Sequence, residues 1–453
     1  MKKLRQSLLL SIPILLSTLV QDASAVPAFA RQTGLECMMC HAQNQTKLNS
    51  FGRSFARSAY TMSTESGSQS LIDGEELGLG IPMILNMSMM LKGRYDKSSG
   101  AINGKGLVLE TQPPNPIESI DSNRGVYEMF KTSTLNIAGR MSENVGGIIE
   151  FREKEGKAIF GGKVAVAFET GEGYTGFVIN STNNYGPFSG IESYNTGLNK
   201  TLRQFENHKL TNAIQASDLG SGPATGVQVY YSGHNFFATL GAYVPAHNSD
   251  GIDIGGSMIP FARLAYEIPM NQMTLIIGAF GMHGTAKASN TSYYTGLIGS
   301  VNTPQALVGV KKESYGFDLQ LEGTLQEMST LLTIAIVPKN KTTLSDPSVM
   351  VDEIAKIYGE PEDAEMQSYS IDLSLSPRPS WSVKIAYLSV NDTGPHYYLL
   401  DKIDVKDKDA VTLGFDYSFR QNIKLTMEYS MVEPKKEGIE NFTDLLTALT
   451  ISF

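Results

Sequence analysis

Grouped basic residues are missing from this chain of 453 residues. Asp, Glu, Lys and Arg together make up only 18% of it, and the formal net charge is −9. Nucleic-acid binding depends on clustered Lys and Arg that neutralise phosphates. The composition therefore argues against a nucleic-acid partner.

Long hydrophobic runs are also missing beyond the N-terminus. No stretch reaches the roughly 18 apolar residues that a membrane-spanning helix requires. Glycine, by contrast, is frequent, with 43 residues, and there are 20 tyrosines. A membrane role would therefore have to be carried by strands, and the composition favours one large β domain with a small appendage.

The N-terminus has the pattern of a secretory signal peptide. Three basic residues in the first five positions precede the apolar run 8–20, and Ala23-Ser24-Ala25 has the small residues of a cleavage site. A retained membrane anchor is the alternative, but the run is shorter than a span and contains Pro13. We expect residues 1–25 to be removed and the mature chain to begin near Val26.

Cysteine is nearly absent, and both cysteines fall in one pentapeptide, Cys37-Met38-Met39-Cys40-His41. Cys-x-x-Cys-His is the attachment signature of a c-type haem. Each thiol forms a thioether with one haem vinyl group, and the adjacent imidazole coordinates the iron. The sequence therefore predicts one covalent haem c, with His41 as its proximal axial ligand.

Two other uses of this motif are weaker. A redox-exchange disulfide between Cys37 and Cys40 is chemically allowed in an oxidising compartment, but no thioredoxin-like alternation of strands and helices surrounds it. A structural zinc site needs about four ligands, and only three lie together.

The sixth ligand of the haem iron is open in the sequence. Met62, which follows His41 within the same leader segment, is the first candidate, and methionine would raise the haem potential relative to histidine. These methionines could equally be packing residues. The remaining candidates are Met83, Met87, Met89, Met90, His208, His234, His247, His283 and His396.

From residue 84 onward, segments of about ten residues alternate apolar and polar positions between turn residues. In 412–419, for example, Leu413, Phe415 and Tyr417 alternate with Gly414 and Asp416. The pattern predicts sixteen strands, near 84–95, 126–140, 143–152, 161–170, 173–180, 224–233, 235–244, 259–268, 272–284, 313–322, 329–338, 366–376, 380–390, 409–419, 422–432 and 443–453.

The predicted connections alternate between long and short. Long ones run over 96–125, 153–160, 181–223, 245–258, 285–312, 339–365, 391–408 and 433–442, and the others are turns such as Gly171-Glu172 and Pro269-Met270-Asn271. Outer-membrane barrels have short periplasmic turns and long external loops. The last strand ends in an aromatic residue, Phe453, as such barrels usually do. A soluble β-sandwich or propeller is the alternative.

These observations predict three parts: a signal peptide over 1–25, a monohaem cytochrome c-like plug over 26–81, and a 16-stranded outer-membrane porin-like β-barrel over 82–453. The leader is too short to bury a large core alone, whereas a barrel of this size can enclose it. Arg31, Arg53 and Arg57 could pair with haem propionates, because guanidinium matches carboxylate geometry. Alternatively, they are ordinary plug or lumen charges.

The leader resembles that of the fused cytochrome-porin family of iron-oxidising bacteria. The resemblance rests on the stretches 26–34, 37–41, 48–55 and 60–61. It implies an outer-membrane Fe(II)-oxidising cytochrome that takes electrons from extracellular Fe(II) and passes them to a periplasmic cytochrome c. It also implies that Cys37 and Cys40 hold the haem and that His41 is its proximal ligand. The sequence departs from the family just after the haem motif. Where many members have aromatic residues, a histidine and a proline, this chain has Ala42, Asn44, Gln45 and Thr46. The departure weakens the inference to Fe(II) as the electron donor and leaves the haem prediction unchanged.

Other functions stay open in the sequence. The barrel could be a solute porin whose haem segment is a plug or sensor, or a conduit for another external donor, or one that exports electrons. For iron, the loop with Asp352, Glu353, Glu360, Glu362, Asp363 and Glu365 offers oxygen ligands suited to divalent cations, although such a run is usually only solvated.

Overall fold

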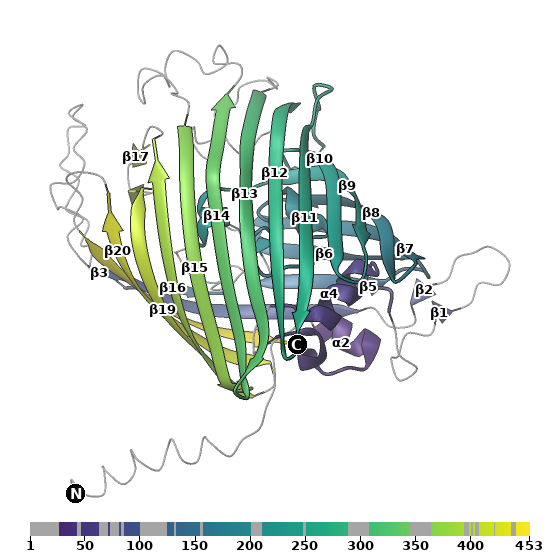
Figure 1. The fold of residues 1–453 in the computed structure, drawn as a ribbon, viewed down its shortest axis with the longest axis horizontal. Helices are drawn as coiled ribbons and strands as arrows, with labels where there is room; N and C mark the ends of the chain where they lie inside the picture. The colour runs from purple at the N-terminus through teal and green to yellow at the C-terminus, as the bar shows by residue number, and fades with distance from the viewer. Residues whose placement is uncertain are drawn as a thin grey trace, which may run out of the picture.

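The protein is seen here as a computed structural model (Figure 1). It describes residues 27–42, 47–62, 71–72, 81–82, 86–99, 125–130, 133–154, 157–200, 211–247, 251–288, 308–344, 364–393, 398–399, 402–403, 407–420, 422–435 and 441–453. The signal peptide, Met83, His208, His396 and the acidic loop except Glu365 lie outside these residues.

Sixteen antiparallel strands, one of them interrupted and labelled β4 and β5, close into a barrel, which confirms the predicted fold. Strand β21 closes it by pairing with β3, so the two ends of the barrel sequence lie side by side. The barrel strands are β3 (Met87–Ser99), β4 (Gly125–Met129) with β5 (Thr134–Arg140), β6 (Val145–Lys154), β7 (Lys157–Thr170), β8 (Gly173–Thr182), β9 (Ala224–Ser232), β10 (Phe236–Val244), β11 (Ile259–Met270), β12 (Met273–Ala288), β13 (Val308–Leu325), β14 (Met328–Leu344), β15 (Ala364–Arg378), β16 (Trp381–Asp392), β19 (Lys408–Arg420), β20 (Ile423–Pro434) and β21 (Phe442–Ser452). Two short pairs lie outside this sheet, β1 (Leu71–Ile72) with β2 (Ile81–Pro82) and β17 (Tyr398–Leu399) with β18 (Lys402–Ile403).

Two local predictions were wrong. The strand predicted over 126–140 is interrupted at Phe130, whose φ of 60° breaks the ladder, and β4 and β5 pair separately with β3. The predicted long connection 153–160 is mostly strand, because β6 continues to Lys154 and β7 begins at Lys157. Elsewhere the turns are as expected, and Gly171 has the positive φ (62°) that the turn between β7 and β8 requires.

The barrel has an apolar outer face, whereas its inner face carries the buried charged and polar residues together with apolar residues such as Phe261 and Phe280. Along β11, Leu264 and Tyr266 point outward and are each 51% exposed, whereas the alternating residues Arg263 and Ala265 are buried. Exposed large apolar side chains also occur on the neighbouring strands, for example Leu240 of β10 and Ile277 of β12. A closed barrel with an apolar exterior and a polar interior is the architecture of outer-membrane porin-like proteins, and the chain is an outer-membrane barrel of this kind.

The leader contributes three short helices, α2 (Pro27–Thr33), α3 (Cys37–Cys40) and α4 (Ser50–Arg57). They lie at the end of the barrel that carries the short turns and the C-terminus (Figure 1). Asn49 caps α4, since its side chain accepts a hydrogen bond from the amide of Gly52. Among the described residues, no helix has the length and hydrophobicity to cross a membrane.

The connection between β8 and β9 folds into the barrel, which the sequence did not predict. It was expected to be an external loop over 181–223, yet the part over 186–199 is mostly buried and contains the 3-10 helix η1 (Pro187–Gly190). Helix α5 (Ala213–Ala216) in the same connection also reaches the inner wall, where the amide of Ala213 donates to Ser370 Oγ of β15. Both described parts of this connection therefore pack against the lumen surface of the barrel.

Candidate functional site

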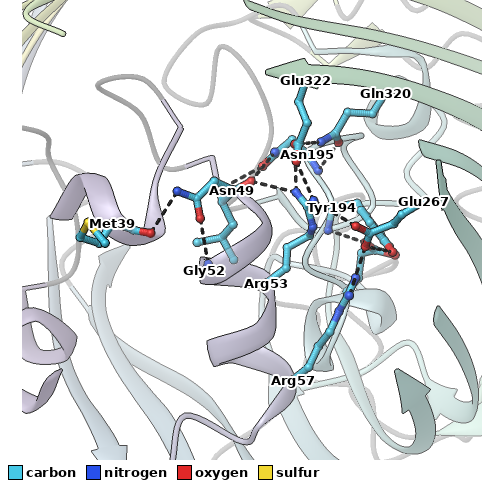
Figure 2. Close-up of polar contacts among 12 residues, drawn as sticks. Met39, Asn49, Gly52, Arg53, Arg57, Tyr194, Asn195, Glu267, Gln320 and Glu322 are labelled. Atoms are coloured by element: carbon cyan, nitrogen blue, oxygen red, sulfur yellow. Dashed lines mark hydrogen bonds and ion pairs between the residues drawn. The ribbon is translucent and has the colours of Figure 1, made fainter. Parts of the chain in front are cut away.

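Helix α4 is held against the barrel wall by buried ion pairs (Figure 2). Arg53, which is fully buried, pairs with Glu322 Oε1 of β13 at 2.6 Å and with Glu267 Oε2 of β11 at 3.3 Å. Arg57, one helical turn later, pairs with Glu267 Oε1 at 3.2 Å. Both carboxylates lie near the short turns that end β11 and β13. The basic face of α4 is thus matched by an acidic patch on the inner wall.

The inward-folded connection completes this contact. The ring of Tyr194 contacts both guanidinium groups, with Arg57 at 4.8 Å and Arg53 at 5.4 Å from its centroid. Its hydroxyl donates a 2.7 Å hydrogen bond to Glu267 Oε1. Next to it, Asn195 donates to the carbonyl of Leu48 and accepts from the amide of the same residue. Leader, inward connection and wall therefore form one buried network.

The predicted haem motif forms the short helix α3 and the strand-like residue that follows it. The Nδ1 atom of His41 lies 3.2 Å from the carbonyl oxygen of Lys47, to which it can donate a hydrogen bond. Such a bond leaves Nε2 without a proton and orients the ring, as is usual for metal-binding histidines. The amide of Asn49 donates to the carbonyl of Cys40, and its side chain donates to the carbonyl of Met39, so the motif is tied to the start of α4.

Close backbone contact between α3 and α4 requires a glycine. A Cβ atom at Gly52 would lie only 2.1 Å from the carbonyl oxygen of Cys40. Burial, reinforced by neighbouring Cys37, raises the pKa of the Cys40 thiol to about 11. Exchange-active cysteines have lowered pKa values instead, so the environment of Cys40 does not resemble theirs.

The motif opens onto a cavity of about 280 Å³ between the leader and the inner wall. Cys37, Cys40 and His41 all line this cavity. The other leader residues that line it are mostly apolar, namely Phe29, Ala30, Thr33, Leu35, Glu36, Leu48, Gly52, Phe55, Ala56 and Tyr60. On the barrel side many lining residues are polar, including Asn136 and Asn180. The cavity therefore offers an apolar side and a polar side at the predicted haem attachment point.

The structure separates the predicted sixth ligands by position. Met62 packs against the cluster of Phe55, Ala56 and Tyr60 and does not line the cavity. Met90, on the inner face of β3, does line it. Met87 and Met89, and the described histidines His234, His247 and His283, are not among the lining residues. Met90 is thus the described methionine that shares the cavity with His41.

The arginines predicted to contact haem propionates make other contacts. Arg53 pairs with Glu322 and Glu267 of the barrel wall and does not line the cavity. Arg31 donates to the carbonyl oxygen of Met87 and is likewise not a lining residue. Arg57 also pairs with the wall. The cations that do line the cavity belong to the barrel, and the sequence reasoning missed them.

For iron as a substrate, the structure offers no prebuilt site in the part of the chain that it describes. There, no group of three His, Cys, Asp or Glu side chains is arranged to hold a metal ion. The acidic loop lies almost entirely outside those residues, so its role stays a prediction.

No protein-family model and no curated protein matches the chain. Among solved structures, it is similar to a loop L8 deletion mutant of the outer-membrane protein OmpT of Vibrio cholerae, at 10% identity over 82% of this chain and 99% of that one, with a TM-score of 0.49. An anion-selective porin from Comamonas acidovorans has 11% identity over 81% and 98% of the two chains, with a TM-score of 0.47. The outer-membrane channel DcaP of Acinetobacter baumannii has 12% identity over 82% and 97%, with a TM-score of 0.43.

Proposed function

We propose that the protein is an outer-membrane electron conduit that oxidises extracellular Fe(II) through a covalently bound c-type haem and passes the electrons to a periplasmic cytochrome. One observation carries the proposal: Cys37, Cys40 and His41 line a single cavity between the leader and the barrel wall. The hydrogen bond between His41 Nδ1 and the carbonyl oxygen of Lys47 also supports it, because metal-binding histidines commonly donate their other ring N–H in this way. Fe(II) as donor is supported by the resemblance of the leader to that of the cytochrome-porin family.

The residues around the cavity suit this cofactor. Cys37 and Cys40 would form the thioethers, and His41 would supply the proximal nitrogen. Met90, which lines the same cavity, would be the second protein ligand of the iron. When bound, a haem supplies one-electron oxidation and reduction at its iron. Apolar residues such as Phe29 and Phe55 would exclude water from its ring.

The ion pairs of α4 hold the leader at the barrel mouth. Removing one partner of a buried pair leaves an uncompensated charge, which typically costs about 3–5 kcal/mol. Docked in this way, the leader acts as a plug that keeps the cofactor cavity closed against the wall. A solute porin with a structural haem plug is the competing function, and it would require a lumen that conducts ions.

The visible absorption spectrum of the purified, air-oxidised protein, taken before and after anaerobic addition of Fe(II), tests the proposal. Sharp bands of a reduced c-type haem are expected on addition. Haem bands that respond to dithionite but not to Fe(II) would leave the haem-bearing barrel intact and exclude iron as the donor. A protein without haem bands after maturation in a host that attaches c-type haem would exclude the proposal as a whole.

A further inference from the structure

The wall of the cavity that faces the haem motif is basic. Four cationic side chains from the barrel line it, namely Lys92 of β3, Arg152 of β6, Lys163 of β7 and Lys424 of β20. Two wall or loop carboxylates also line it, and each is already paired: Glu150 with Arg152 at 2.8 Å and Glu192 with Arg263 at 2.8 Å. Glu36 of the leader is a third lining carboxylate, so four cations and three carboxylates line the cavity.

Arg152 is held in a fixed orientation at this surface. Its guanidinium lies 4.7 Å from the ring centroid of Tyr185, and its Nη2 donates to Glu150 Oε1. The hydroxyl of Tyr185 donates to the same oxygen at 2.6 Å. The Nε of Arg152 is buried and has no hydrogen-bond partner among the described residues. A buried cationic N–H without an acceptor is costly, so this group is suited to an additional anionic partner.

Lys163 is the second lining cation whose described contacts do not include a carboxylate for its ammonium group. Its Nζ donates to the carbonyl of Ser189 at 3.0 Å and lies 5.3 Å from the ring centroid of Tyr60. Neither contact supplies a negative charge, and no carboxylate pairs with Lys163 within the described ranges. An ammonium group has three donors and needs a counter-charge when it is withdrawn from water. Because Ser189 belongs to the inward connection and Tyr60 to the leader, Lys163 lies where leader, connection and wall meet.

We propose that Arg152 and Lys163 bind the two propionate carboxylates of the covalently attached haem. The inference rests on the proposed function. Cys37 and Cys40 would hold a haem to the leader through its vinyl groups, and the barrel wall would then be the surface that binds its carboxylates. Guanidinium and ammonium groups both form strong charge-assisted hydrogen bonds to carboxylate. The leader thus binds the cofactor covalently, and the barrel sets its charge environment.

This assignment has a measurable electrostatic consequence. Cations beside the cofactor favour the reduced iron, which carries one positive charge fewer than the oxidised iron. Removing them should lower the midpoint potential. It should also raise the pKa of the propionates, because an opposite charge favours the ionised carboxylate. The range of pH over which the potential depends on pH should then move upward.

The experiment compares the full-length, haem-loaded protein with Arg152→Gln, Lys163→Gln and the double variant. Haem content is measured by the pyridine haemochrome spectrum, folding by heat-modifiable gel mobility, and midpoint potential by redox titration from pH 5 to 9. We expect unchanged haem content, a lower potential in each single variant and a larger drop in the double variant. Arg152→Lys should retain most of the wild-type potential, since it keeps the charge, and Lys339→Gln, on the barrel wall away from the cavity, should retain all of it.

Folded double-variant protein with full haem content and an unchanged potential and pH dependence would overturn the inference while leaving the proposed function standing. If the double variant does not fold, the midpoint potential of Lys163→Gln and the difference in potential between Arg152→Gln and Arg152→Lys decide the same question. Wild-type protein without haem would instead overturn the proposed function, and the inference with it.

Discussion

Two patches of the inner wall face the leader, and they have opposite charge. The patch on β11 and β13 presents Glu267 and Glu322, which pair with the arginines of α4. The patch on β6 and β7 presents Arg152 and Lys163 to the cavity beside the haem motif. The acidic patch therefore binds the positive charges of the leader. The basic patch, by contrast, is suited to an anionic group in the cavity.

This difference indicates how one short segment is oriented inside a wide barrel. A helix of eight residues has little surface of its own to bury, so the ion pairs with the acidic patch add to the packing of Phe55 and Ala56 in holding its position. With α4 in place, the hydrogen bonds from the amide and the side chain of Asn49 tie α3 to α4, and His41 then lines the same cavity as the basic patch. Each of the following variants removes one element of this arrangement.

The largest effect is expected from Cys37→Ser combined with Cys40→Ser. Both thioethers are lost, so covalent haem should be absent while the acidic patch still holds α4. In-gel haem peroxidase staining after denaturation measures the attachment. Met39→Leu is the matched control, since Met39 lies between the cysteines but is 52% exposed. Covalent haem in the double variant would show that the motif is not its attachment site.

Glu267→Gln combined with Glu322→Gln should release the leader. Arg53 and Arg57 would lose their carboxylate partners while buried, at a cost of about 3–5 kcal/mol. We expect faster proteolysis of the leader and higher ion conductance in planar bilayers, with an intact barrel. Glu313→Gln, which removes an exposed pair with Lys339, should change neither measurement. A leader that stays protected in the double variant would mean that the acidic patch does not position it.

Gly52→Ala tests the contact between α3 and α4. The added methyl group meets the carbonyl oxygen of Cys40, and the required backbone shift should cost about 1–3 kcal/mol. Reduced haem incorporation and easier proteolysis of the leader are expected. Ser54→Ala, in the same helix, should behave as wild type. Normal haem content in Gly52→Ala would show that the two helices can separate without consequence.

The smallest change is expected from Met90→Leu, which alters the environment of the iron without removing the cofactor. If Met90 is the axial thioether, its loss should lower the midpoint potential and change the spin state seen in the oxidised absorption spectrum. Met62→Leu should leave both unchanged, because Met62 packs outside the cavity. The reverse pattern would restore Met62 as the ligand.

The sequence was sufficient to predict the sixteen-stranded barrel because alternation is a local pattern, and the haem motif is likewise a local pattern of five consecutive residues, whose cofactor stays a prediction. Alternation places Arg263 inside and Leu264 outside whatever the neighbouring strands do. By contrast, nothing local distinguishes Arg152 and Lys163 from other inward-facing residues of alternating strands, since their importance arises only from what the leader places beside them. For the same reason, Met62 was preferred over Met90, which is distant from His41 in sequence.

The inward folding of the connection between β8 and β9 was unpredictable on similar grounds. Its polar, glycine-containing sequence is typical of an external loop. Its buried position depends on pairs such as Glu192 with Arg263 and on the hydrogen bond between the Asn195 amide and Gln320. These partners lie on distant strands, so only the closed barrel brings them together.

Electron transfer across a membrane is the most direct test of the proposed haem conduit. The protein is reconstituted into liposomes that enclose oxidised cytochrome c, and Fe(II) is added outside under anaerobic conditions. We predict reduction of the enclosed cytochrome by the wild-type protein and none by the variant with Cys37→Ser and Cys40→Ser. Equal reduction with both proteins would show that iron passes through an open pore and would contradict a haem conduit.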